Sequence, residues 1–317
     1  MRTAFMRALT GLAARDPRVT FLTGDLGFSF VEAFAARFPD QYVNIGVAEQ
    51  NMAGVAAGLA LAGRVVFTYS IGNFPTLRCL EQVRNDICYH RLNVKIVAVG
   101  GGYAYGALGA SHHATEDLAV MRALPEMTVV APGDPVEAEL ATRAIAAHVG
   151  PCYLRLAKSG EPIVHAAPPD FAIGRAITIR PGRDCTLIST GAMLPAAAAA
   201  AAELGRAHRV DARVVSMHTV APLDAAAVRA ACDTAAIVTI EEHSATGGLG
   251  SAVAEVLAGL RGHPPLHRVA LPAAFAPAAG SQAYLLERAG LTTRAIVDGV
   301  AALLAPAGRG ASAADPA

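Results

Sequence analysis

The chain has 317 residues, of which 53% are apolar and 16% are charged. This length suits two domains, and the apolar fraction excludes a disordered protein. Lys plus Arg and Asp plus Glu both total 26, so the formal net charge is zero. A neutral chain argues against nucleic acid or an anionic membrane surface as its main partner.

Several features indicate a cytoplasmic protein with no membrane association. No stretch of 18 or more consecutive apolar residues occurs, so a membrane-spanning helix is not expected. The first twelve residues carry Arg2 and Arg7 on an amphipathic pattern, without the apolar core and cleavage site of a signal peptide. The five cysteines are scattered and include no C-x-x-C pair, which predicts reduced thiols.

In the first half of the chain, short β-rich apolar runs alternate with helical patterns. The expected strands are Val19–Thr23, Tyr42–Ile45, Val65–Thr68, Val94–Val99, Thr128–Ala131 and Cys152–Leu156. The expected helices are Phe30–Phe38, Gln50–Ala62, Thr76–His90, Glu116–Leu124 and Pro135–Ala147. This alternation favours a mostly parallel sheet covered by helices on both faces.

A segment rich in proline separates this block from a second, smaller one, as in a domain linker. The strands expected there are Cys185–Ser189, Ala212–Ser216, Ala236–Glu241 and Leu266–Ala270. The helices expected there are Leu194–Ala207, Leu223–Cys232, Gly248–Leu260 and Thr292–Leu304. The prediction is an α/β chain with two domains in series. They occupy residues 1–160 and 183–305, with a linker and lead-in at 161–182 and a flexible tail at 306–317.

One carboxylate stands between an expected strand end and an apolar helix rich in small residues. Glu49 lies in the sequence Gly46-Val47-Ala48-Glu49-Gln50-Asn51-Met52. In an open α/β sheet, ligands gather at the carboxyl ends of the strands. With few charged residues near it in sequence, burial would favour the neutral carboxyl form, which suits proton transfer. Position alone leaves open the alternative that Glu49 only starts the helix, where the dipole stabilises a carboxylate.

This motif, followed by a G-x-x-x-G helix, resembles the pyrimidine-binding domain of thiamine-diphosphate enzymes of the transketolase family. The resemblance covers roughly residues 1 to 305 and implies that domain followed by the smaller C-terminal α/β domain of the family. Segments that match in order and spacing are 23–26, Phe74, 81–85, 109–113, 125–129, 241–243 and 247–250.

The resemblance implies that thiamine diphosphate is the cofactor. Glu49 would hydrogen-bond a ring nitrogen of the aminopyrimidine and thereby activate the cofactor, and Phe74 would stack on that ring. The position of the family's other aromatic residue in this loop is occupied by Ile71, a departure that leaves open which residue stacks. A separate alternative is that Phe74 is an ordinary core residue. The other cofactor-binding residues implied by the match are Asp25, Leu26 and Arg84.

Substrate-binding residues are implied in the loop that follows the fourth expected strand. His112 corresponds to a catalytic histidine that contacts substrate oxygen atoms in transketolases. A metal site at His112 and His113 is an alternative, but adjacent histidines rarely converge on one ion. His113 stands where transketolases have glutamine. Leu108 stands where sugar-processing members have an aspartate that binds a donor hydroxyl, which predicts an altered donor choice.

Two cations end the last strand of the first block, where relatives of this family place phosphate-binding residues. Arg155 and Lys158 are therefore predicted to hold an anionic end of the substrate. The alternative is that both are merely solvated at the strand end.

The sequence lacks the G-D-G…Asn signature by which these enzymes hold the diphosphate through a divalent metal. The resemblance therefore implies no metal ligands in this chain, and Mg²⁺ or Ca²⁺ bound mainly by a separate N-terminal subunit. The expected assembly is an α2β2 heterotetramer acting on a sugar or sugar phosphate in carbohydrate metabolism.

The expected reaction is transfer of a two-carbon ketol unit from a ketose-type donor to an aldehyde or ketone acceptor. One alternative is acyl or acyloin transfer with decarboxylation of a 2-oxo acid, as in deoxyxylulose-phosphate synthase or the oxo-acid dehydrogenases. The other is a non-catalytic regulatory subunit.

Overall fold

The alternating pattern of the first half folds into a seven-stranded sheet in the computed structural model, which describes residues 1–305. The strand order is β10-β5-β6-β4-β3-β1-β2, and every neighbouring pair is parallel apart from β10 with β5. The strands are β1 Val19–Thr23, β2 Tyr42–Asn44, β3 Val65–Ile71, β4 Val94–Val99, β5 Thr128–Val130, β6 Cys152–Leu156 and β10 Thr219–Ala221.

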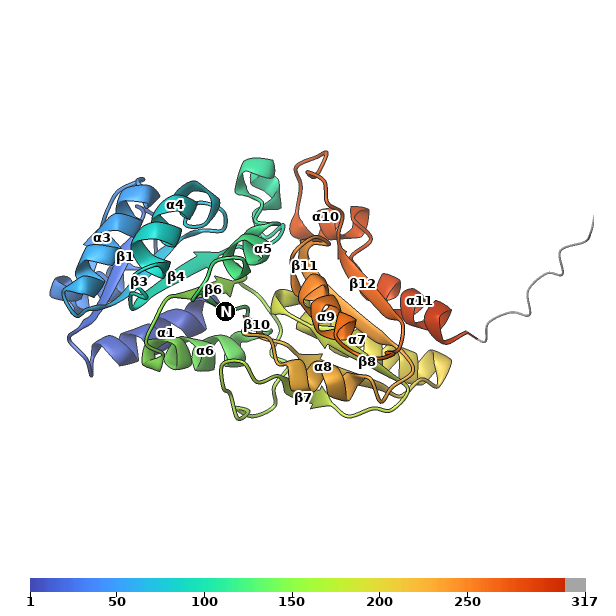
Figure 1. Cartoon of the computed structure of the whole chain (residues 1–317). Coiled ribbons are helices and arrows are strands. Elements are labelled where there is room, and N and C mark those ends of the chain that lie inside the picture. Colours follow the sequence, from blue (N-terminus) through green and yellow to red (C-terminus); the bar gives the residue numbers. More distant parts are fainter. Residues whose placement is uncertain (306–317) are drawn as a thin grey trace, which may run out of the picture.

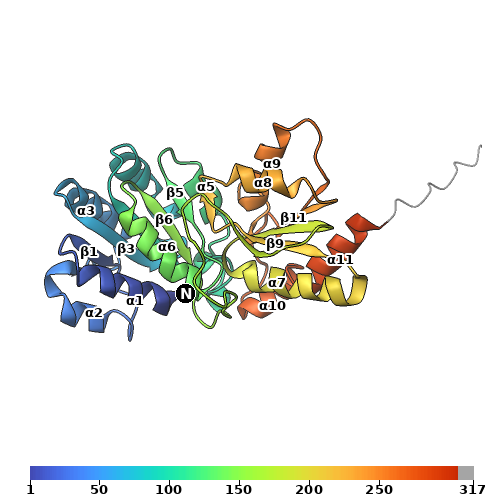
Figure 2. The same ribbon diagram turned by 90° about the horizontal axis from the view of Figure 1, so that it is seen from below.

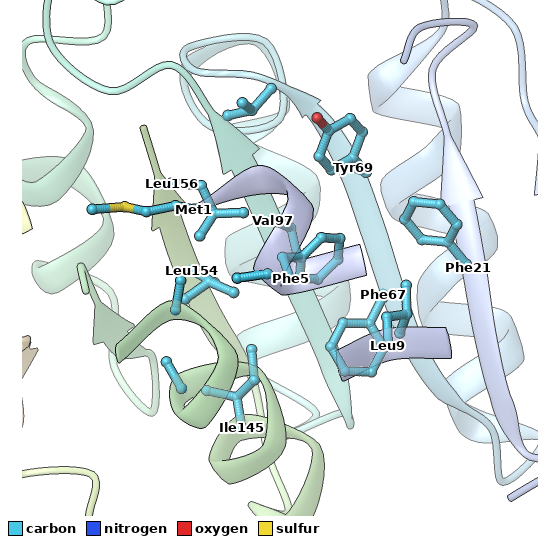
Figure 3. Packing of buried hydrophobic residues seen from close by; sticks show 14 of the residues in the cluster. Met1, Phe5, Leu9, Phe21, Phe67, Tyr69, Val97, Ile145, Leu154 and Leu156 are labelled. Atoms are coloured by element: carbon cyan, nitrogen blue, oxygen red, sulfur yellow. The ribbon is translucent and has the colours of Figure 1, made fainter. Parts of the chain in front are cut away.

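Helices cover both faces of this sheet (Figure 1). On one face α1 and α6 pack against the strands and against each other, and α3, α4 and α5 cover the opposite face. Figure 3 shows Phe5 and Leu9 of α1 packed beside Phe67 and Leu154 of the sheet and Ile145 of α6. The helices are α1 Arg2–Ala13, α2 Glu32–Arg37, α3 Glu49–Leu61, α4 Leu80–Gln82, α5 Asp117–Arg122 and α6 Pro135–Ala147.

The second half forms a five-stranded sheet in the order β12-β11-β8-β9-β7, parallel apart from β7 with β9. Helices α7 and α11 pack on one face, and α8 and α9 on the other (Figure 2). The strands are β7 Ile177–Arg180, β8 Cys185–Ser189, β9 Ala212–Ser216, β11 Ile237–Ser244 and β12 Leu266–Leu271. The helices are α7 Leu194–Glu203, α8 Ala225–Ala231, α9 Leu249–Ala258, α10 Gln282–Arg288 and α11 Thr293–Leu304.

Two strands and one α-helix of the structure were not expected from the sequence. Strand β10 lies within the second expected domain but adds to the sheet of the first, where Thr219 pairs with Val130. Strand β7 lies inside the segment expected to be a linker and lead-in, and α10 has no counterpart among the expected helices. Strands of three or four residues are too short to show a periodic pattern in the sequence. Whether such a segment forms a strand depends on the strand beside it in space.

The continuous helix expected over Thr76–His90 is wrong. The segment instead divides into a 3₁₀ turn at Leu77–Cys79, the short α4 and a π-helical turn at Val83–Cys88. The π turn widens the repeat, so that Val83 and Cys88, five positions apart, are both buried in the core beneath α3.

Within residues 1–305, no helix has the length and apolarity needed to cross a lipid bilayer. The expected tail at 306–317 lies outside the described residues.

Candidate active site

The candidate residues gather at the carboxyl edge of the seven-stranded sheet. Glu49 begins α3 after the loop that follows β2, Phe74 follows β3 and His112 follows β4. Gly24 follows β1, and a Cβ atom there would lie 3.4 Å from Oε1 of Glu49. Parallel strands bring their carboxyl-terminal loops side by side, so residues far apart in the sequence meet at this edge.

Glu49 is buried, with 2% of its surface exposed, and each carboxylate oxygen accepts one hydrogen bond. Oε1 accepts from the hydroxyl of Ser70 at 2.9 Å, and Oε2 accepts from Nη1 of Arg78 at 2.7 Å. The Arg78 guanidinium, from 29 positions further along the chain, therefore lies directly on the carboxylate. The amino end of α3 stabilises the same negative charge.

An aromatic ring connects this ion pair to the imidazole of His112. The guanidinium carbon of Arg78 lies 4.3 Å from the centroid of the Phe74 ring. The Phe74 and His112 rings are 5.1 Å apart with an interplanar angle of 69°. Phe74 is only partly buried, with the Arg78 guanidinium over its ring and the His112 imidazole against it. The Glu49 carboxylate, the Arg78 guanidinium, the Phe74 ring and the His112 imidazole thus form one series of contacts.

The His112 loop, which we define as residues 100–116 between β4 and α5, carries two of the expected substrate-binding residues at its tip. Leu108 ends the 3₁₀ turn Gly106–Leu108 and is 55% exposed. His112 ends the next such turn, and its Nδ1 atom lies 3.0 Å from the Ser111 hydroxyl. The loop is joined to the Phe74 segment, because the side-chain amide of Asn73 donates to the Ser111 carbonyl at 2.9 Å.

Two residues expected to bind substrate are placed elsewhere. Arg155 is buried: its guanidinium binds the Asp117 carboxylate, with Nε 2.7 Å from Oδ2, and donates to the carbonyls of Ala114 and Glu242. The expectation that Arg155 holds an anionic substrate does not agree with this placement. His113 is 5% exposed and packs against the Tyr103 ring, so it faces the protein interior.

The remaining expected residues differ in their relation to Glu49. Asp25 and Leu26 follow Gly24 at the site edge, where Asp25 exchanges hydrogen bonds with Asn44. The structure does not bring Arg84 to the carboxylate. Its guanidinium bonds the side chain of its own neighbour Asn85 and lines a separate surface groove. Lys158 is exposed, with Nζ 4.8 Å from the centroid of the Tyr105 ring.

Sequence reasoning missed the partners of two buried charged side chains, Glu49 and Arg155. Ser70 was a possible signal, because it is a polar residue within an otherwise apolar strand. Arg78 and Asp117 gave no such signal. They reach their partners through contacts 29 and 38 positions apart in the chain.

The comparisons with known proteins agree with this geometry. Residues 1–161 match the family described as transketolase, pyrimidine binding domain, and residues 174–296 match transketolase, C-terminal domain. The chain belongs to the transketolase family. The predicted family and fold class are thereby confirmed, and the chain is of the transketolase type of transferase.

Transketolase relatives of nearly the same length are named as subunits. The 6-deoxy-6-sulfo-D-fructose transketolase subunit SqwH of Clostridium sp. (strain MSTE9) is 39% identical over 299 residues, or 94% of this chain and 92% of that protein. A subunit of the apulose-4-phosphate transketolase of Phocaeicola vulgatus is 39% identical over 259 residues, or 81% and 83%. A solved structure described as a split gene transketolase, inactive beta4 tetramer, matches with a TM-score of 0.88 at 40% identity. The match covers 96% of this chain and 97% of that one.

Transketolases depend on thiamine diphosphate, and the residues at the sheet edge fit its pyrimidine half. Each Glu49 oxygen accepts only one hydrogen bond, which leaves acceptor capacity for a ligand. The partly exposed Phe74 ring is a flat apolar group that contacts the same Arg78 side chain as Glu49 does. Between residues 1 and 305, no three His, Cys, Asp or Glu side chains are grouped closely enough to hold a metal ion.

Proposed function

We propose that this chain is the C-terminal subunit of a two-chain, thiamine-diphosphate-dependent transketolase. It would transfer a two-carbon ketol unit from a ketose-type donor to an aldehyde or ketone acceptor. The observation that carries the proposal is the buried Glu49 carboxylate, which Arg78 connects to the partly exposed Phe74 ring. Relatives named as subunits, which this chain matches over most of their length, support the two-chain organisation.

Glu49 would act as the proton-exchanging group toward the aminopyrimidine. Thiamine diphosphate supplies the carbon nucleophile and the electron sink when it is bound. The Glu49 carboxyl would hold a proton at Oε2 and share it with a ring nitrogen, as a desolvated acid can. The Arg78 side chain is 43% exposed, so it can leave Oε2 without opening the core. Phe74 would stack on the ring, and Asp25 and Leu26 would line its edge.

The His112 loop would contact the donor. His112 is placed beside Phe74, where its imidazole can move protons to and from donor oxygen atoms. Leu108 offers no hydrogen-bond acceptor to a donor hydroxyl, which favours a donor other than a standard sugar phosphate. Lys158 is the exposed cation at the end of β6 that could attract an anionic group, since Arg155 is engaged by Asp117.

The second chain would supply what these residues do not offer. It would hold the diphosphate through Mg²⁺ or Ca²⁺ and seat the pyrimidine ring against Glu49, giving an α2β2 heterotetramer in the cytoplasm. Such a partner would carry the G-D-G…Asn signature.

Reconstitution tests the proposal. The chain is mixed with a partner chain that carries the G-D-G…Asn signature, thiamine diphosphate and Mg²⁺, and assayed with a panel of ketose and ketose-phosphate donors and glycolaldehyde as acceptor. We expect ketol transfer by the mixture, no turnover by either chain alone, and a loss of at least about 100-fold for Glu49→Gln. Glu81→Gln is the matched control, because this exposed glutamate lies on α4.

Two outcomes would contradict the proposal. Full activity of Glu49→Gln would remove the carboxyl group from the mechanism. Release of carbon dioxide in step with turnover of a 2-oxo acid, without ketol transfer, would favour the acyl-transfer alternative.

A further inference from the structure

The two ends of the His112 loop meet in a short bridge between Gly102 and Ala114. The Gly102 N–H donates to the Ala114 carbonyl at 2.7 Å, and the Ala114 N–H donates back at 3.0 Å. Both legs of the loop are thereby fixed close to each other at the loop base. The tip, which carries Leu108 and His112, projects beyond this bridge.

The C-terminal half of the chain forms hydrogen bonds at the base of both legs. On the first leg, the Tyr103 N–H donates to Oε1 of Glu242 at 2.7 Å. On the second leg, Nη2 of Arg155 donates to the Ala114 carbonyl and also to the main-chain carbonyl of Glu242, both at 2.9 Å. Glu242, on β11, therefore contacts one leg directly and the other through Arg155.

A second contact from the same half reaches the loop nearer its tip. The Gly280 N–H donates to the Gly106 carbonyl at 3.2 Å. A Cβ atom at Gly106 would lie 2.6 Å from the carbonyl oxygen of Gly280 and from Leu285, so only glycine allows this approach. Gln282 links this part of the chain to Glu242. Its side-chain amide donates to Oε1 of Glu242 at 3.0 Å and to Oε2 at 2.9 Å.

The fit around the Glu242 carboxyl is close. Glu242 is 2% exposed, and a Cβ atom on Gly102 would lie 2.4 Å from its carboxyl carbon. Gly102 also has a φ of +64°, which favours glycine. Glu242 is therefore packed tightly against the first leg of the loop, so that the position of one constrains the other.

We propose that the C-terminal domain positions the His112 loop for the reaction, and that Glu242 is the positioning residue at the centre of this contact. The inference rests on the proposed function, in which His112 acts on the donor. The inference gives the C-terminal domain a part in the site, although Glu49, Phe74 and His112 all belong to the first domain. Glu242 touches neither donor nor cofactor and acts through the Tyr103 main chain and Arg155.

The test compares Glu242→Ala and Glu242→Gln with Glu241→Ala as the matched control. Glu241 is the adjacent buried glutamate of β11, but its carboxylate accepts from the N–H groups of Leu249 and Gly250 at the start of α9. Removing Glu241 therefore disturbs the same domain without loosening the loop. The Gln282→Ala variant removes only one donor to Glu242 from a half-buried position, and it keeps the test usable if Glu242→Ala does not fold.

Hydrogen–deuterium exchange of the isolated chain gives the first readout. We expect Glu242→Ala to accelerate exchange over residues 102–114, Gln282→Ala to do so less, and Glu241→Ala to accelerate it over α9 instead. The Glu242→Gln variant should restore protection, because its amide oxygen can still accept from the Tyr103 N–H. Unchanged exchange over residues 102–114 in both Glu242→Ala and Gln282→Ala would overturn the proposal, and so would an equal increase throughout the chain.

Kinetics of the reconstituted enzyme give the second readout. Glu242→Ala should lower kcat/KM for the donor by about 10- to 100-fold while cofactor affinity stays within about twofold, since a misplaced loop affects the donor rather than Glu49. Wild-type kinetics for Glu242→Ala in the presence of a loosened loop would overturn the catalytic part of the proposal. A fully active His112→Ala variant would instead refute the proposed role of His112, and the exchange result would still decide whether the domain positions the loop.

Discussion

The Arg78 guanidinium donates a hydrogen bond of 2.7 Å to the carboxylate of Glu49, and the two side chains differ sharply in burial. The Glu49 side chain is 1% exposed and that of Arg78 is 43% exposed. Because the outer partner lies partly in water, the pair can open without unpacking the core. Arg78 therefore covers the buried acid that we propose for contact with the cofactor, and it lies on Phe74 at the same time.

Replacing Arg78 by Met keeps the apolar stem of the side chain and removes its charge. We expect the free energy of unfolding to fall by about 1 kcal/mol, because Glu49 loses a partner that is itself half in water. Chemical denaturation of the isolated chain measures this change. Arg84→Met is the control, since Arg84 bonds only the side chain of its neighbour Asn85 and its removal should have a smaller effect. Equal effects of the two variants would contradict the Glu49 pairing.

The Phe74→Leu variant tests the stacking role of this ring. Loss of ring stacking removes about 0.5–1.5 kcal/mol beyond the burial of apolar area. We expect thiamine diphosphate to bind the reconstituted enzyme roughly 3- to 10-fold more weakly. Recovery of activity on titration with the cofactor gives the affinity. Phe74→Tyr keeps the ring and should bind as the wild type does, whereas unchanged affinity in Phe74→Leu would mean that the pyrimidine does not stack there.

The position of Glu49 could be predicted because its signal is local. A strand end, a short loop and a helix of small residues follow one another within the chain, and the parallel sheet brings such junctions to one edge. The positions of Phe74 and His112 at this edge follow from the same rule, since each comes after a strand.

The place of Arg155 could not be predicted in this way. An arginine at the end of an apolar strand gives the same sequence pattern whether its side chain binds substrate or a buried carboxylate. The structure decides between them through Asp117, 38 positions away, and the carbonyl of Glu242, 87 positions away. Strand β10 escaped prediction for a related reason, because its three residues become a strand only by pairing with β5.

The buried pair of Asp117 and Arg155 predicts a large loss of stability when one partner is removed. Burial alone would raise the pKa of Asp117, but the Arg155 guanidinium holds this pKa below its ordinary value, so the pair stays ionised. Asp117→Asn leaves Arg155 buried without its counterion, and we expect the free energy of unfolding to fall by about 3–5 kcal/mol. Chemical denaturation measures this fall.

A surface pair is the control for this prediction. Asp170 binds Arg175, and its side chain is 87% exposed, so Asp170→Asn should cost less than about 1 kcal/mol. The simultaneous replacement of Asp117 by Leu and Arg155 by Met should recover part of the loss, because no unpaired charge then stays buried. A small effect of Asp117→Asn would show that the guanidinium is satisfied by the carbonyl groups alone.

The segment after β6 carries a pH-dependent contact. The hydrogen bond from Nε2 of His165 to Glu137, at 2.8 Å, raises the pKa of His165 above its ordinary value of 6.5. A raised pKa means that the contact contributes fully below about pH 6.5 and loses its contribution as the pH rises through the folded-state pKa. The stability difference between wild type and His165→Gln should therefore shrink with rising pH.

Chemical denaturation of both proteins at pH values from about 5.5 to 8.5 checks this prediction. Taking the difference between the two proteins is necessary because burial lowers the pKa of the neighbouring His218, which has the opposite effect on stability. A difference that grows as the pH rises would show that His165 is not held in its charged form by Glu137.

We predict that the side chain of Leu108 affects which donor the enzyme selects. Its side chain is 55% exposed at the tip of the His112 loop, so a polar residue can replace it without burying a charge. Leu108→Asp would add an acceptor for a donor hydroxyl, and a group placed to bind a hydroxyl favours substrates that carry it. We expect the ratio of kcat/KM for a hydroxylated donor to that for its deoxy analogue to rise by about tenfold. Leu108→Ala removes the same apolar side chain without adding an acceptor and should leave this ratio unchanged. If both variants shift the ratio equally, the size of Leu108 and not its lack of an acceptor governs donor choice.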